Sequence, residues 1–172
     1  MKNKNTKTSK TTVKNTSTIL TLDLGIKTGW AIRDNTTTIS SGTNCFKPSR
    51  RESNKMIYLR FKRWLTDLKK AVGGFDAIHF QEVRKHVRTD AVYGYGGFMA
   101  HLIVFAIHHN IPYRCVPVQA IKRNITGRGY SSREEVIYAI KSKGFNPADY
   151  NESNALALLN LVLINEILGI RI

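Results

Sequence analysis

The sequence has few acidic residues for its length. Among 172 residues, 12 are Asp or Glu and 27 are Lys or Arg, which gives a formal net charge of +15. Such an excess argues against a cationic partner and favours a polyanion, because each Lys or Arg near a phosphate releases condensed counterions. Nucleic acid is the common polyanion, and an anionic membrane surface is the rival.

Cysteine is also scarce. Cys45 and Cys115 are far apart and form no CxxC pair. This argues against a disulfide framework and against a zinc site. Two reduced thiols are typical of a cytosolic protein.

Long apolar runs are missing as well. The most apolar stretch, residues 155–168, contains Asn160, Asn165 and Glu166, and it is shorter than the roughly 20 residues that a membrane-spanning helix needs. The N-terminus lacks the apolar core of a secretory signal. We therefore expect no membrane association and no secretion. The expected location is the cytoplasm or the DNA-containing compartment of a host.

Residues 1–17 differ in composition from the rest of the chain. They contain five lysines, no acid and almost no aliphatic residue, so they cannot bury enough surface to offset the entropy of ordering. We predict a disordered basic arm, which either grips phosphates or is a solvated tail. Residues 18–172 remain basic without it and are predicted to form the folded domain.

Apolar periodicity predicts a mixed α/β domain after this arm. Three strands open it, and the remaining strands alternate with helices. Strands are expected at 19–22, 29–33, 36–46, 75–81 and 113–116, and helices at 53–71, 98–108, 118–124, 132–143 and 152–168.

Three acids stand where these elements begin or end: Asp23, Glu82 and Glu152. Ligands of open α/β sheets bind near strand ends, so the three carboxylates can converge there. Clustered carboxylates suit a hard cation such as Mg²⁺, and two such ions can stabilise both the attacking and the leaving oxygen of a phosphodiester. Each acid alone can equally be a surface carboxylate or a helix cap, and Glu152 most of all.

The segment after the first strand reads Asp-Leu-Gly-Ile-Lys-Thr-Gly-Trp-Ala at residues 23–31. Its two glycines would let the backbone approach a phosphate or a metal closely. The pattern is similar to the phosphate loop of the actin and heat-shock chaperone ATPases, but that fold needs a second lobe. It also resembles the first motif of RuvC-type Holliday junction resolvases.

Three further segments resemble resolvase motifs in the same order along the chain. They are Phe-Gln-Glu at 80–82, the basic Ile-Lys-Arg-Asn-Ile-Thr-Gly-Arg-Gly at 121–129 with Ser-Arg-Glu-Glu at 132–135, and Asn-Glu-Ser-Asn-Ala-Leu-Ala-Leu-Leu at 151–159. The resemblance implies a ribonuclease H-like fold with a mixed five-stranded sheet flanked by helices. It also implies a homodimer, Mg²⁺ or Mn²⁺, two ions in each site, and paired nicks in branched DNA such as a four-way junction.

The resemblance also implies roles for single residues. Asp23 and Glu82 would be metal ligands, Lys122 would lie near the scissile phosphate, and Arg133 stands where the family often has lysine. Asn154 departs from the family, because it occupies the place of the last catalytic Asp. Asn151 stands where some members have a further Asp.

An amide oxygen can ligate Mg²⁺ but brings no charge, so Asn154 has three explanations. The chain is an active-site variant, or it is a weak or binding-only relative, or Glu152 supplies the missing charge. The first two are favoured, because helix residues two positions apart point about 200° apart.

Basic residues near these motifs are candidates for DNA contact. Arg84, Lys85, His86 and Arg88 follow Glu82, and the basic segment adds Lys122, Arg123, Arg128 and Arg133. A solvated charge run is the alternative. Residues 93–98 suggest a flexible glycine loop whose aromatics either stack on unpaired bases or enter the core. The apolar helix after them offers a dimer face.

The sequence therefore predicts a structure-selective endonuclease that resolves branched DNA by two-metal-ion hydrolysis. Its main rival is a catalytically silent branched-DNA-binding protein of the same fold, which Asn154 favours. An actin-type ATPase is a weaker rival, and so is a general basic RNA-binding protein. An RNA-binding protein of that kind would leave the ordered motifs unexplained.

Overall fold

The computed structural model describes residues 16–50, 52–53, 56–82 and 89–170. Most of the expected basic arm and the basic residues Arg84, Lys85, His86 and Arg88 lie outside these ranges. None of the helices in the described part of the chain combines the length and the apolarity needed to cross a lipid bilayer.

Within these described ranges, five strands and five helices follow one another in the predicted order. The strands are β1 (Ile19–Asp23), β2 (Lys27–Arg33), β3 (Ile39–Cys45), β4 (Ala77–Glu82) and β5 (Tyr113–Pro117). The helices are α1 (Met56–Ala71), α2 (Thr89–His108), α3 (Val118–Thr126), α4 (Arg133–Ser142) and α5 (Tyr150–Leu168).

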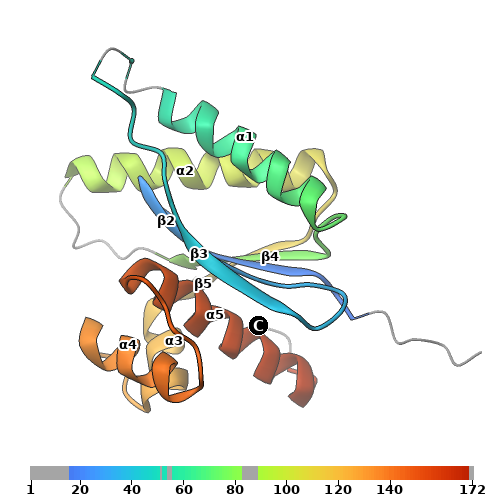
Figure 1. Cartoon of the computed structure of the whole chain (residues 1–172), viewed down its shortest axis with the longest axis vertical. Coiled ribbons are helices and arrows are strands. Elements are labelled where there is room, and N and C mark those ends of the chain that lie inside the picture. The colour runs from blue at the N-terminus through green and yellow to red at the C-terminus, as the bar shows by residue number, and fades with distance from the viewer. Residues whose placement is uncertain (1–15, 51, 54–55, 83–88, 171–172) are drawn as a thin grey trace, which may run out of the picture.

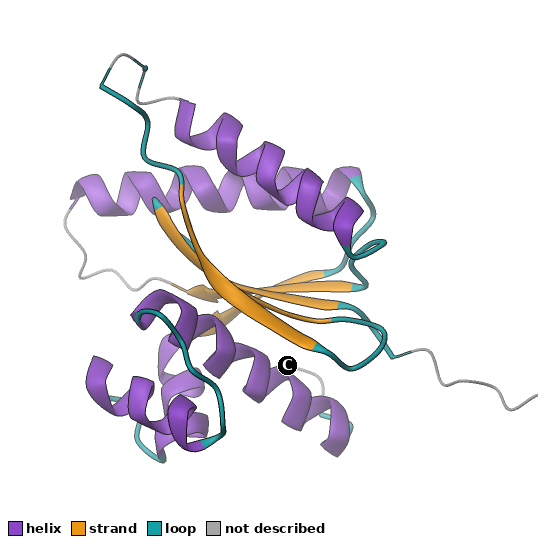
Figure 2. Ribbon diagram, viewed as in Figure 1, coloured by secondary structure: helices purple, strands orange, loops and turns teal. Residues whose placement is uncertain are grey.

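The strands form one mixed sheet in the order β3-β2-β1-β4-β5. The first three strands pair antiparallel, as expected for a three-stranded opening. Strand β4 runs parallel to both β1 and β5. Figures 1 and 2 show the sheet between two helical layers, with α1 and α2 over one face and α3, α4 and α5 over the other.

Side chains of β1 alternate between these two layers, as strand geometry requires. Leu20 and Leu22 join the core under α1 and α2. Ile19 belongs to the core under α5, and the Thr21 hydroxyl donates to the Ala155 carbonyl of α5 over 2.8 Å. Asp23 continues this second series, so its carboxylate points toward the α5 layer.

Helix α2 begins nine residues earlier than the sequence pattern suggested. The predicted glycine loop at residues 93–97 is wrong, because these residues lie inside the helix. Gly97 has a packing reason: a Cβ there would lie 2.3 Å from the ring of Tyr58 on α1. The glycine therefore lets α1 and α2 approach each other. This contact overrides the low helix propensity of the glycines.

Gly29 of β2 permits a second close approach. A Cβ at this position would lie 1.9 Å from the carbonyl oxygen of Asn151 in the first turn of α5. The glycine therefore brings the α5 backbone onto the sheet. It serves packing within the chain, and the expected approach of the backbone to a phosphate or a metal stays a prediction.

We predict that Gly29→Ala destabilises the fold by about 3 kcal/mol, because backbone atoms cannot yield as a flexible side chain can. The free energy of unfolding in urea measures this loss. Gly94→Ala is the matched control, since a Cβ there meets nothing within 4 Å. Equal stability of the two variants would show that α5 does not depend on this approach.

Candidate active site

Asp23 is the centre of the site. It ends the middle strand of the sheet, where it is only partly exposed. Both of its carboxylate oxygens accept hydrogen bonds from carboxamides. Asn154 Nδ2 of α5 donates to Oδ2 over 2.9 Å, and Gln81 Nε2 of β4 donates to Oδ1 over 3.2 Å.

The surroundings of Asp23 disfavour its charged form. Burial raises the pKa of this carboxyl from 3.8 to about 6, and the negative charge of Asp149 adds to the rise. The hydrogen bond from Asn154 and the positive charge of Arg133 act in the opposite direction. Desolvation is the dominant cause, because a buried carboxylate loses the water that stabilises its charge.

A threonine helps to hold the loop after Asp23. The buried hydroxyl of Thr28 donates to the Gly25 carbonyl over 2.7 Å and accepts from the Gly25 amide over 3.2 Å. These two bonds close the turn between β1 and β2. The motif threonine therefore fixes the backbone that follows Asp23.

Gln81 is a site residue that the sequence reasoning missed. The parallel register pairs Leu22 with Phe80, so the next residues, Asp23 and Gln81, are neighbours on the same face. The sequence did contain a signal for Gln81, because side chains alternate along a strand. Ile78 and Phe80 belong to the core under α1 and α2, so Gln81 faces the opposite layer, as Asp23 does.

Glu82 follows the opposite alternation. As the residue after Gln81, it shares the face of Phe80, on the far side of the sheet from the Asp23 carboxylate. Its side chain is exposed. Burial raises the pKa of Cys115 on β5, and the negative charge of Glu82 adds to this rise. The structure does not bring Glu82 to Asp23, and its predicted role as a metal ligand stays a prediction.

Asp149 is a second residue that the sequence reasoning missed. It caps α5 by accepting from the Glu152 amide over 2.9 Å, and it also accepts from the Thr43 hydroxyl over 2.7 Å. Asn151 donates a further side-chain hydrogen bond to it. An Asp before a helical run is a capping signal, and here the cap lies within electrostatic reach of Asp23.

The carboxylate of Glu152 is buried and turned to other partners. It accepts from the Ser41 hydroxyl of β3 over 2.6 Å and from the Ala148 amide over 2.8 Å. These contacts fit the helix-cap interpretation of this acid. They also hold α5 to the edge of the sheet, and they engage both carboxylate oxygens away from Asp23.

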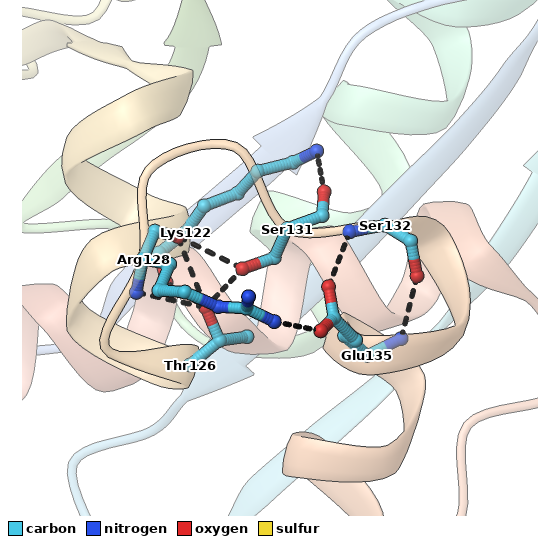
Figure 3. Close-up of polar contacts among 6 residues, drawn as sticks. All are labelled: Lys122, Thr126, Arg128, Ser131, Ser132 and Glu135. Atoms are coloured by element: carbon cyan, nitrogen blue, oxygen red, sulfur yellow. Dashed lines mark hydrogen bonds and ion pairs between the residues drawn. The ribbon is translucent and has the colours of Figure 1, made fainter.

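A basic loop joins α3 to α4, and Figure 3 shows its internal contacts. The Lys122 ammonium donates to the Ser131 carbonyl over 2.5 Å, and Thr126 bonds to the Ser131 hydroxyl. Arg128 forms an ion pair with Glu135, whose carboxylate also belongs to the capping box of α4. Most of the Arg128 side chain remains accessible to solvent.

Arg133 connects this basic loop to Asp23. Its guanidinium lies 5.1 Å from the ring centroid of Tyr150, and Tyr150 is hydrogen-bonded to Asn154. Arg123 is exposed on α3. The predicted DNA contacts Lys122, Arg123, Arg128 and Arg133 are therefore on α3, α4 and their connection, in the same layer as α5.

The donors around Asp23 do not suit a pair of divalent ions. In the residues that the structure describes, no group of three or more His, Cys, Asp or Glu side chains is placed to hold a metal. Asp23 supplies one negative charge, and Asn154 and Gln81 supply none. Mg²⁺ is usually held by one or two carboxylates together with waters and substrate phosphates. Two ions would have to share the single carboxylate of Asp23 here, so this set does not fit the expected two-metal site.

The fold is that of the RuvC resolvases. RuvC of Thermus thermophilus in complex with a Holliday junction substrate superposes with a TM-score of 0.73 and 17% identity, covering 90% of this chain and 97% of that chain. A second Thermus thermophilus RuvC structure gives a TM-score of 0.69 and 17% identity, covering 88% of this chain and 96% of that one. The expected ribonuclease H-like fold is confirmed.

No protein-family model matches the sequence, and no curated protein matches it. The likeness therefore lies in the fold. The actin-type alternative requires two lobes, whereas the described ranges build one five-stranded sheet with its helices.

We predict that Asp23→Asn stabilises the protein at about pH 8 and not at about pH 4. The pKa of Asp23 is raised in the folded state, so burying the anion costs stability above about pH 6, and this cost disappears as the pH falls toward 3.8. The gain is about 1–3 kcal/mol, since one pKa unit corresponds to about 1.4 kcal/mol. Chemical denaturation at the two pH values measures it.

Asp34→Asn is the control of opposite sign. Hydrogen bonds from Thr36 lower the pKa of the exposed Asp34, so losing its charge removes stability above that pKa. If Asp23→Asn were destabilising at high pH, the hydrogen bonds that Asp23 accepts from Asn154 and Gln81 would outweigh the cost of burying its charge.

Proposed function

We propose that this chain acts on branched DNA, with the four-way junction as its substrate class. The observation that supports this most is the fold likeness to RuvC over nine-tenths of the chain. Asp23 at the end of β1 and the basic α3–α4 connection give that fold a charged site beside a cationic surface. The overall charge of +15 suits the phosphate density of two converging duplexes.

The first candidate activity is that of a structure-selective endonuclease that resolves the junction by phosphodiester hydrolysis. Asp23 would be its central carboxylate, and Lys122 and Arg133 would position phosphates. A homodimer would present two such sites to opposite strands. A divalent ion, Mg²⁺ or Mn²⁺, would have to supply the chemistry. The donor set around Asp23 does not suit a pair of such ions.

The second candidate activity is binding of the junction without cleavage. The carboxamide of Asn154, which donates to Asp23 over 2.9 Å, favours it. A neutral side chain at this point leaves the cationic surface and the fold intact while removing an anionic oxygen. A protein of this kind would hold branched DNA or shield it from other enzymes.

A paired assay on a labelled four-way junction tests the proposal. The natural chain and Asn154→Asp are compared for binding and for nicking in Mg²⁺ and in Mn²⁺, with a linear duplex of the same sequence as the competitor. We expect both proteins to prefer the junction, because phosphate contacts depend on how the strands are arranged and carry no base-sequence information.

The outcomes separate the two candidates. Symmetric nicks by the natural chain support the endonuclease, and nicks by Asn154→Asp alone support a resolvase fold inactivated at this position. Binding by both proteins without a nick supports the silent binder. If neither protein prefers the junction over the duplex, branched DNA is not the substrate class.

A further inference from the structure

Two positions, one on β4 and one on α5, face the Asp23 carboxylate, and both carry carboxamides. Gln81 reaches one oxygen over 3.2 Å and Asn154 reaches the other over 2.9 Å. Sequence motifs indicated Asn154 alone, because they assigned the strand acid to Glu82. The register of β1 and β4 changes this assignment, since it is Gln81 that lies beside Asp23.

The carboxamides present their donor ends to Asp23. An NH₂ group that donates to a carboxylate occupies the lone pairs that a metal ion would need. Turning either amide to offer its oxygen would break its bond to Asp23 and still add no charge. Hydrogen bonds from the two amides therefore stabilise the Asp23 carboxylate here, whereas bound cations would stabilise it in a metal-dependent nuclease.

The neighbouring acids do not replace the missing charges. Glu152 is bonded to Ser41 and Ala148. Asp149 is engaged by Thr43 and by the α5 backbone. Glu82 belongs to the opposite face of the sheet. Each of these acids is hydrogen-bonded to other groups or lies on the other face of the sheet, so none shares a metal site with Asp23.

We propose that Gln81 and Asn154 together replace two carboxylates of a metal-dependent nuclease site, so that this chain engages branched DNA without binding the divalent ions that cleavage requires. This inference rests on the proposed function for its DNA partner. It differs from a single inactivating change at Asn154, because restoring only that residue leaves Gln81 against Asp23. Both positions must become acidic for the metal site to return.

The test is a calorimetric titration of the 172-residue chain with Mn²⁺ alone. We expect no binding by the natural chain and at least a hundredfold tighter binding by Q81E/N154D, on the order expected when two charges are added beside a cation. Each single variant should fall well below the double variant. The isosteric control N35D/N110D adds two carboxylates away from Asp23 and should bind no better than the natural chain.

Adding Glu82→Gln to the double variant tests the register. We expect the Mn²⁺ affinity to be unchanged, because Glu82 faces away from Asp23, and a tenfold or greater loss would overturn the assignment of Gln81. Tight Mn²⁺ binding by the natural chain would overturn the whole inference, even if the double variant failed to fold. Circular dichroism checks that folding.

Junction binding in EDTA is measured separately on the natural chain. If the chain did not bind the junction, the proposed DNA partner would be refuted. The Mn²⁺ titrations would still test whether Gln81 and Asn154 replace metal ligands. Junction binding without metal, together with a metal site that appears only in Q81E/N154D, supports both proposals.

Discussion

The contact between the first turns of α5 and the central strands positions everything else at the site. Gly29 removes the side chain that would collide with Asn151, and Thr21 bonds to the Ala155 carbonyl. Together they fix the distance between α5 and the strands β1 and β2, and the position along these strands at which the helix crosses them. Asn154 lies between these two contacts along α5, so its carboxamide reaches Asp23 because of the packing.

The same packing explains the electrostatics. Asp23 is covered by α5 and by Gln81, so water cannot solvate its charge fully, and its pKa rises to about 6. In a nuclease the cost of gathering carboxylates is offset by bound cations. Here two neutral amides lower that cost by hydrogen bonding. Such a site is easier to fold without ions, and it offers few anionic oxygens that would attract them.

Much of the fold could be predicted from the sequence, because its elements carry clear apolar periodicity. The order of strands and helices, the antiparallel opening and the prominence of Asp23 all followed from local patterns. The start of α2 did not, since the glycines at 94, 96 and 97 suggest a loop unless the helix α1 that packs on Gly97 is known.

The site was predicted less completely than the fold, for reasons of register and geometry. A motif that ends in Gln-Glu suggests Glu82 as the site residue. The alternation of side chains along β4 decides which of the two lies beside Asp23, and that residue is Gln81. Asp149 was missed because the helix was predicted to begin at residue 152, whereas it begins at Tyr150, directly after Asp149. The contact of Glu152 with Ser41 depends on strand β3, which is more than a hundred residues away.

The central claim is that Asp23 is held by amides and not by metal ions. The most direct measurement is the NMR spectrum of the side-chain NH₂ groups of Gln81 and Asn154 during addition of paramagnetic Mn²⁺ to the chain without DNA, because DNA phosphates would themselves bind the ion. We expect both signals to persist at Mn²⁺ concentrations equal to that of the protein, because no ion settles beside Asp23. Selective disappearance of these two signals at low Mn²⁺ would contradict it.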